Sequence, residues 1–120
     1  MQKYRVKGFT LVEIMIVVAI IGIIIAIAIP SFIRARETSR ARACQENLSK
    51  IDGAKEQYAL DGNLGHNDAI GGGLPTLVGP TNYIKATPSC PAGGAYTLGN
   101  IGVTPTCDYA QPAYAPAHAI

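Results

Sequence analysis

The sequence predicts an α+β fold in which one long amino-terminal helix packs against a small, loop-rich head that carries a short antiparallel hairpin. Two observations support this prediction. Residues Phe9 to Ile29 form an aliphatic and aromatic run that only Thr10, Glu13 and Gly22 interrupt. From Gly62 onward the composition changes, because ten of the thirteen glycines and seven of the eight prolines lie there. A segment so rich in glycine and proline does not form long helices or strands.

The apolar run predicts a membrane-spanning helix over residues 9–30. As an α-helix, residues 9–29 would extend about 31 Å, enough to cross a hydrocarbon core. The preceding residues carry three basic groups and no acid, and this bias places the amino terminus in the cytoplasm and the rest of the chain outside. Those basic groups are Lys3, Arg5 and Lys7. No A-x-A signal-peptidase site follows the run, so we expect it to remain in the mature protein.

Glu13 is the one acid inside this run. A carboxylate facing lipid costs about 2.5 to 3.5 kcal/mol on insertion scales, so the group needs a partner. A cut before Phe9 would create an amine one helical turn away, and Glu13 could pair with that amine or with the same amine of a neighbouring subunit. The alternative is a single-pass anchor whose acid reaches up to the membrane interface.

The segment Lys7-Gly8-Phe9-Thr10-Leu11-Val12-Glu13 resembles the processing site of type IV prepilins and of type II secretion pseudopilins. The resemblance includes the basic leader, the glycine, the acid, the apolar helix and Pro30. It implies that a membrane peptidase removes residues 1–8, cutting between Gly8 and Phe9, and then methylates the amine of Phe9. It further implies that Glu13 pairs with the Phe9 amine of a neighbour and fixes the axial register of a helical filament.

Gly22 and Pro30 interrupt an otherwise strong helix. Proline in a helix interior removes a backbone donor and clashes with the preceding turn, at a cost of about 3 kcal/mol. We therefore predict a kink between Ile25 and Pro30. Two interpretations remain open: Pro30 marks the exit from the bilayer, or, as the family implies, the segment from Gly22 to Pro30 stretches or unwinds within a filament.

Residues 31–61 are predicted to continue the helix with an amphipathic pattern. Its apolar stripe follows three- and four-residue steps. The stripe comprises Ala41, Cys44, Leu48, Ile51, Lys55 and Tyr58, with Ala54 as the alternative to Lys55. Four arginines, at positions 34, 36, 40 and 42, could indicate nucleic acid or a membrane surface. Lipid headgroups and acidic neighbours explain them, and without the leader the chain has seven basic and eight acidic side chains. Nucleic acid is therefore not an expected partner.

Residues 62–120 are predicted to form the small head. We expect a loop over 62–74, a loop with a helical turn over 76–85, a hairpin of Ala95–Leu98 with Thr104–Tyr109, and a tail over 110–120. Cys90 and Cys107 flank the hairpin, so we predict a disulfide between them, which would be worth about 3 kcal/mol. Cys44 is expected to be a buried thiol, although three cysteines permit three single bridges.

No enzyme, metal site or cofactor is predicted. His66 and His118 are the only histidines, and neither has a second ligand at metal-binding spacing. The glycines at 71–73 lack the lysine and the serine or threonine of a phosphate-binding loop. No arrangement of serine, cysteine and histidine suggests a nucleophile.

The sequence therefore indicates a structural subunit of a type IV pilus-like filament. The alternatives are a type II secretion pseudopilin and a minor tip subunit that binds a surface or DNA. The expected partners are copies of the chain, the prepilin peptidase and methyltransferase, and the pilus or secretion assembly machinery. We expect the subunit in the bacterial inner membrane before assembly, with its head in the periplasm or outside, and then in a periplasmic or extracellular filament.

Overall fold

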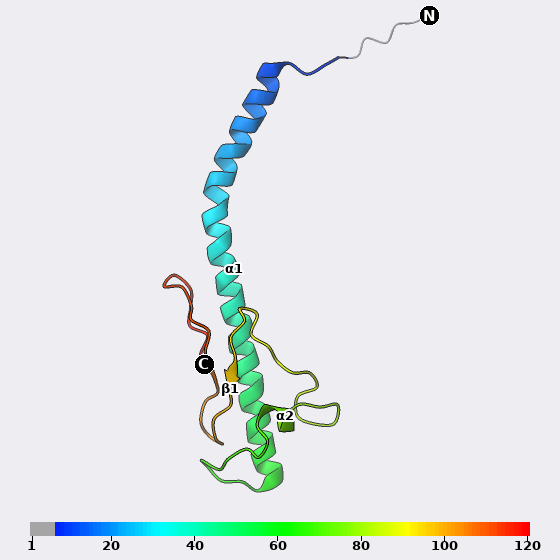
Figure 1. Ribbon diagram of the computed structural model, residues 1–120, viewed down its shortest axis with the longest axis vertical. Helices are drawn as coiled ribbons and strands as arrows, with labels where there is room; N and C mark the ends of the chain where they lie inside the picture. The colour runs from blue at the N-terminus through cyan, green and yellow to red at the C-terminus, as the bar shows by residue number, and fades with distance from the viewer. Residues whose placement is uncertain (1–6) are drawn as a thin grey trace, which may run out of the picture. The chain divides into compact units, whose positions relative to one another are not determined.

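The computed structural model describes residues 7–120 and contains four elements (Figure 1). They are α1 (Leu11–Gly62), α2 (Leu74–Leu77), β1 (Tyr96–Thr97) and β2 (Thr106–Cys107). Residues 1–6, which include most of the predicted leader, lie outside the described residues. The long helix and the short antiparallel pair confirm the predicted α+β class. The chain divides into two compact units, Met1–Arg34 and Ala35–Ile120.

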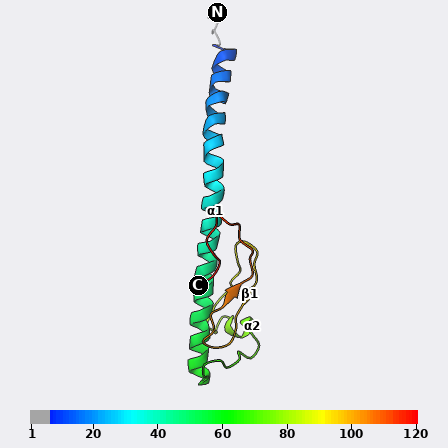
Figure 2. The ribbon, with the colours of Figure 1, turned by 90° about the vertical axis from the view of Figure 1, so that its left-hand side faces the viewer.

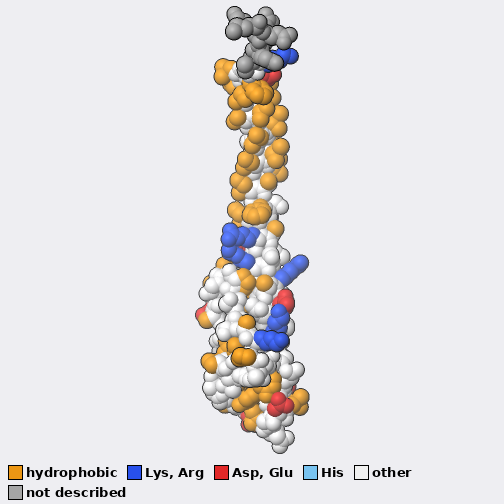
Figure 3. All heavy atoms as spheres, turned by 90° about the vertical axis from the view of Figure 1, so that its right-hand side faces the viewer, with side chains coloured by type: hydrophobic (Ala, Val, Ile, Leu, Met, Phe, Trp, Pro, Cys, Tyr) orange, Lys and Arg blue, Asp and Glu red, His pale blue; other side chains and the backbone are white. Residues whose placement is uncertain are grey.

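The first unit is the apolar part of α1. All its described side chains are exposed, including Phe9 at 85% and Ile27 at 74%. Hydrophobic side chains cover this part of the helix in the space-filling view (Figure 3). By length and composition, α1 is able to cross a membrane. An apolar surface of this extent does not persist in water, so lipid or other protein chains must cover it.

The helix continues through both of its predicted weak points. Gly22 and Pro30 lie inside α1, and Pro30 is its one internal proline. The lost hydrogen bond at Pro30 therefore does not end the helix. The kink predicted between Ile25 and Pro30 stays a prediction.

In the second unit, one face of α1 supports the head. Its buried residues are Ala41, Cys44, Leu48, Ile51, Ala54, Lys55 and Ala59. This confirms the stripe predicted from residue spacing, except that Ala59 is buried where Tyr58 was expected, and Tyr58 is only half-buried. The small residues allow the head loops to approach the helix backbone closely. In both ribbon views the head lies beside this half of α1 (Figures 1 and 2).

The end of α1 uses a left-handed residue. Asn63 follows the helix with φ of 50°, and the N–H of Leu64 donates to the carbonyl of Ala59 at 2.8 Å. A residue in the left-handed region directly after a helix satisfies the last free carbonyls, and asparagine is the commonest choice after glycine. The helix thus ends one residue beyond the boundary predicted at residue 61.

The head contains the predicted hairpin in a shorter form. β1 and β2 pair antiparallel, with Tyr96 opposite Cys107 and Thr97 opposite Thr106. The predicted helical turn is α2, which begins at Leu74, earlier than expected, because Pro75 is suited to the first turn of a helix. Residues 78–85 then return to α1, and Tyr83 donates its hydroxyl proton to Asp61 at 2.7 Å.

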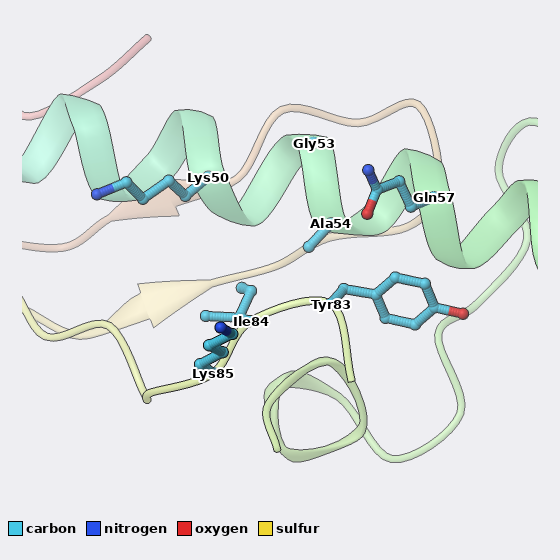
Figure 4. A pocket seen from close by; sticks show the side chains of 7 residues that line it. All are labelled: Lys50, Gly53, Ala54, Gln57, Tyr83, Ile84 and Lys85. Carbon is cyan, nitrogen blue, oxygen red and sulfur yellow. The ribbon is translucent and has the colours of Figure 1, made fainter. Parts of the chain in front are cut away.

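A shallow groove of about 370 Å³ separates α1 from this returning loop. Figure 4 shows side chains from α1 and from the loop facing one another across it. Its lining residues are Lys50, Gly53, Ala54, Gln57, Tyr83, Ile84 and Lys85. Adding a Cβ atom to Gly53 would meet no atom within 4 Å, so the helix backbone is accessible at this groove.

Polar side chains of α1 attach the head loops to the helix. Lys55 is completely buried and donates to the carbonyls of Leu98, at 2.7 Å, and Val103. Asn47 donates to the carbonyl of Ser89 at 3.0 Å, and Gln45 donates to that of Ala117 at 2.8 Å. The segment 110–120, predicted to be a tail, is therefore irregular in backbone but docked on the helix.

Candidate assembly site

Thr10 and Glu13 form a capping box at the start of α1. The backbone N–H of Thr10 donates to Glu13 Oε2 at 2.8 Å, and the Thr10 hydroxyl donates to the same oxygen at 3.0 Å. In return, the N–H of Glu13 donates to Thr10 Oγ1 at 3.2 Å. This reciprocal pattern satisfies backbone donors that a helix start otherwise leaves without partners.

The sequence interpretation missed this local role of Glu13. The signal was available, because threonine followed three residues later by glutamate and an apolar run is the usual capping-box pattern. Glu13 thus has a hydrogen-bond partner within its own chain, independent of any amine created by processing. Both bonds end on Oε2, so a further donor can approach the carboxylate at Oε1.

Gly8 and Phe9 precede the helix in irregular backbone. Both are exposed, and a Cβ atom added to Gly8 would meet nothing within 4 Å. The peptide bond between them is therefore accessible to another protein. Because the chain itself leaves room for a side chain at Gly8, any requirement for glycine there comes from whatever binds this segment.

The predicted disulfide residues belong to a larger cluster. Cys44, Cys90 and Cys107 are free thiols, so the bridge between Cys90 and Cys107 stays a prediction. The three sulfurs and a ring nitrogen of His118 all lie within 4.8 Å of one another. Cys44 is completely buried, as expected for its place on the stripe. His118 is only 3% exposed, and its Nδ1 lies 3.6 Å from Cys90 Sγ.

The surroundings shift the pKa values of Cys44 and Cys90 in opposite directions. Burial raises the pKa of Cys44 to about 12, although a hydrogen bond from Tyr96 acts in the opposite direction. At Cys90 burial also acts to raise the pKa, but backbone N–H groups of Ala92 and Gly94 donate to the sulfur, and together with the neighbouring thiols they hold the pKa below its ordinary value. Hydrogen bonds to the charged form favour it. Cys90 thus becomes a thiolate more readily than Cys44 does.

The comparisons with known proteins agree with the features at the start of the helix. A family model described as the prokaryotic N-terminal methylation motif matches residues 3–29. The chain is 32% identical over 108 residues to the type II secretion system core protein G of Escherichia coli (strain K12), a match that covers 80% of this chain and 73% of that protein. The chain belongs to the type IV pilin and pseudopilin family.

Two type IV pilins extend the comparison. The identity to the type IV major fimbrial protein FimA of Dichelobacter nodosus is 37% over 100 residues, covering 81% of this chain and 64% of that protein. The type IV major pilin protein PilA of Myxococcus xanthus (strain DK1622) is 48% identical over 54 residues, 45% of this chain and 24% of that protein. No solved structure matches this chain significantly.

Membership of this family gives the general function. The chain is a filament subunit that is processed by prepilin peptidase, and it polymerises with copies of itself. Its relatives are pilins and pseudopilins rather than enzymes. The apolar half of α1 fits a membrane anchor before assembly and a filament core afterwards.

Proposed function

We propose that this pilin-family chain is the main structural subunit of a filament of the type II secretion kind. The observation that carries this proposal is the extent of the match to core protein G, which spans 108 residues and therefore includes part of the head. The chain also covers 76% of the core protein G of Aeromonas hydrophila, at 31% identity over 110 residues. The match to PilA, in contrast, spans only 54 residues.

A type IV pilus subunit is the second candidate. The match to FimA covers a similar share of this chain, 81%, but the chain spans only 64% of FimA itself. Deletion of the gene distinguishes the two candidates. We expect loss of protein export to the medium with surface pili retained, and restoration of export by the wild-type gene. Loss of surface pili with normal export would favour the pilus candidate instead.

In the proposed cycle, prepilin peptidase cuts between Gly8 and Phe9 and the Phe9 amine is methylated. The amino terminus faces the cytoplasm and the head faces the periplasm, because the basic groups precede the apolar run. Assembly machinery then draws the subunit from the inner membrane into the filament. This order requires Glu13 to be compatible with the membrane first and with a neighbouring subunit afterwards.

The capping box is consistent with both requirements. Hydrogen bonds from Thr10 to Oε2 supply part of the solvation that the carboxylate loses in the membrane. The amine of a neighbouring Phe9 then pairs with the remaining side of the carboxylate. Because the surroundings are apolar, such a pair is weakly screened and strongly favours one axial register.

Two substitutions distinguish the capping hydrogen bonds between Thr10 and Glu13 from the negative charge of Glu13. Glu13→Gln keeps an acceptor for Thr10 but removes the negative charge, whereas Thr10→Val removes the hydroxyl and keeps the charge. We expect the Glu13→Gln subunit to be stable and processed but to enter filaments poorly beside wild-type subunits, and the Thr10→Val subunit to enter them. Normal incorporation of Glu13→Gln, measured by mass spectrometry of sheared filaments, would contradict the pairing.

A further inference from the structure

A four-residue cluster joins α1 to the head and includes none of the residues of the candidate assembly site. Its members come from four separate parts of the chain: Cys44 from α1, Cys90 from the loop before β1, Cys107 from β2 and His118 from the docked carboxy-terminal segment. Among the described residues they bring three thiols and one imidazole within 4.8 Å of one another. We propose that these four side chains bind one Zn²⁺ ion, which fastens the head to α1.

The separations fit tetrahedral zinc. Zinc–sulfur bonds of about 2.3 Å and zinc–nitrogen bonds of about 2.0 Å place neighbouring ligand atoms roughly 3.5 to 3.8 Å apart. The 3.6 Å between Cys90 Sγ and His118 Nδ1 lies within that range, and the 4.8 Å limit on the whole set requires only small side-chain movements. One site therefore accommodates all four ligands.

The ligand chemistry selects the metal. Three thiolates and one imidazole are a known ligand set of closed structural zinc sites. Calcium and magnesium prefer oxygen ligands, which this cluster does not offer. On binding, each thiol transfers its proton to solvent, and the resulting centre carries one net negative charge without any change of oxidation state.

Groups around the ligands are placed to support thiolates. Backbone N–H groups of Ala92 and Gly94 donate to Cys90, and the hydroxyl of Tyr96 donates to Cys44. Asn47 in turn donates to Tyr96 Oη at 3.1 Å and so fixes its orientation. Hydrogen bonds of this kind orient ligands and tune the affinity of metal sites. Polar groups around Cys44 and Cys90 thus distinguish this cluster from cysteines that only pack as small apolar residues.

His118 supplies an independent indication. Its backbone N–H donates to Gln111 Oε1 at 3.1 Å, and its ring lies against Tyr109 with centroids 4.7 Å apart, so the side chain is held in place. Its Nε2 is buried without a hydrogen-bond partner, while Nδ1 faces the sulfur of Cys90. Nδ1 is therefore the ring nitrogen that a metal ion in the cluster would use.

A disulfide explains less of this arrangement. One bridge uses two sulfurs and leaves the third thiol and the imidazole buried beside it. A zinc ion uses all four ligands and connects three head segments to the helix. The head has a small apolar cluster, centred on Cys44, Leu48 and Cys90, so a bound metal would contribute a large part of its stability.

The test uses the full chain, purified in detergent from membranes without chelator or reductant. We expect about one zinc per chain by elemental analysis. Exchange for Co²⁺ should give a thiolate-to-cobalt charge-transfer band and the visible bands of a tetrahedral site. These two measurements need no variant. Substoichiometric zinc that added Zn²⁺ does not bring to one per chain, or a linked peptide that joins two of the cysteines, would overturn the proposal.

Matched variants then identify the ligands. His118→Ala should weaken zinc binding by about 100-fold or more, whereas His118→Cys should retain one zinc, because four thiolates also form a closed zinc site. His66→Ala is the control, since His66 is exposed and lies outside the cluster. Circular dichroism of α1 verifies that each variant is folded. Equal zinc content in the His118→Ala variant and the wild type would show that His118 is not a zinc ligand.

Discussion

At the scale of single residues, Gly8 and Gly94 differ in whether the chain itself leaves room for a side chain. A Cβ atom on Gly8 would meet nothing within 4 Å, so the chain itself tolerates a side chain there. A Cβ atom on Gly94 would lie 2.7 Å from Cys107 Sγ and 2.8 Å from the Cβ of Tyr109. Separations this short do not occur in folded proteins. Substitutions at the two positions should consequently affect processing in one case and folding of the head in the other.

At Gly8, we expect Gly8→Val to leave uncut precursor in the inner membrane, because the added side chain would have to fit the peptidase cleft. The measurement is the intact mass of the membrane-bound chain, which distinguishes precursor from mature subunit. Gly22→Ala is the matched control, since a Cβ atom there also meets nothing within 4 Å. A normal mature mass for Gly8→Val would show that the cut lies elsewhere.

At Gly94, we expect Gly94→Ala to destabilise the head by about 2 kcal/mol, the usual range for overpacking. Denaturant unfolding in detergent, followed by tyrosine fluorescence, measures this, because the chain has six tyrosines and no tryptophan. Gly71→Ala is the control, because its Cβ atom would meet nothing within 4 Å. Equal midpoints for both variants would mean that the loop adapts without cost.

At the scale of elements, Lys55 is the residue that connects α1 to the loop after β1. Its ammonium group donates to the carbonyls of Leu98 and Val103, and Asp52 lies 4.0 Å away. Burial lowers the pKa of Lys55, while the charges of Asp52 and Glu56 act to raise it. The cost of burying the charge is thus partly compensated by two charge-assisted hydrogen bonds.

We expect Lys55→Met to lower the free energy of unfolding by about 2 kcal/mol, because the two part-buried hydrogen bonds from the ammonium group to the carbonyls of Leu98 and Val103 are lost. The difference in free energy of unfolding between the variant and the wild type should increase as pH rises from the lowered pKa of Lys55 toward the ordinary pKa of lysine. Within that window the unfolded wild-type chain binds a proton that the folded chain does not. The free energy of unfolding of the wild type therefore increases as pH rises.

Denaturant midpoints of both proteins, measured at several pH values, test this expectation. Lys50→Met is the control, because Lys50 is exposed and its pair with Glu46, at 2.7 Å, is a surface ion pair of little energetic value. A Lys55→Met variant as stable as the Lys50→Met variant would show that the two carbonyls find other donors.

At the scale of the whole molecule, the two units differ in the exposure of their apolar side chains. The described part of the first unit exposes its apolar side chains throughout, whereas the second unit buries its apolar stripe beneath the head. Lysine and arginine side chains gather on the helix just beyond the apolar stretch (Figure 3). The first unit therefore requires lipid or neighbouring subunits, and the second has its own small core.

A chain that begins at Ala35 should consequently be a soluble monomer, whereas the full chain should need detergent. Because the head keeps its contacts with residues 41–59, we also expect cooperative unfolding of the truncated chain. Size-exclusion chromatography with light scattering measures the first property and thermal circular dichroism the second. Concentration-dependent polymers of the truncated chain would show that head contacts, rather than the apolar helix, drive assembly.

Features that depend on neighbours in the sequence could be predicted without the structure. The apolar run predicts the helix, three- and four-residue steps predict its buried face through Ile51, and the spacing of turn residues predicts the hairpin. The capping box of Thr10 and Glu13 could equally have been predicted from the sequence. These features are local because helix periodicity, capping and tight turns involve residues only a few positions apart.

Features that join distant parts of the chain were decided by the tertiary structure alone. Nothing in the spacing of Cys44, Cys90, Cys107 and His118 indicates one cluster, because a helix, a hairpin and a docked terminal segment must all be in place before the four meet. The burial of Lys55 likewise depends on loop carbonyls more than forty residues away. The sequence by itself therefore determined a membrane-compatible helix with a processing motif, since these follow from local patterns. Only the folded head determined which polar and sulfur groups face one another, since that depends on how the loops pack on α1.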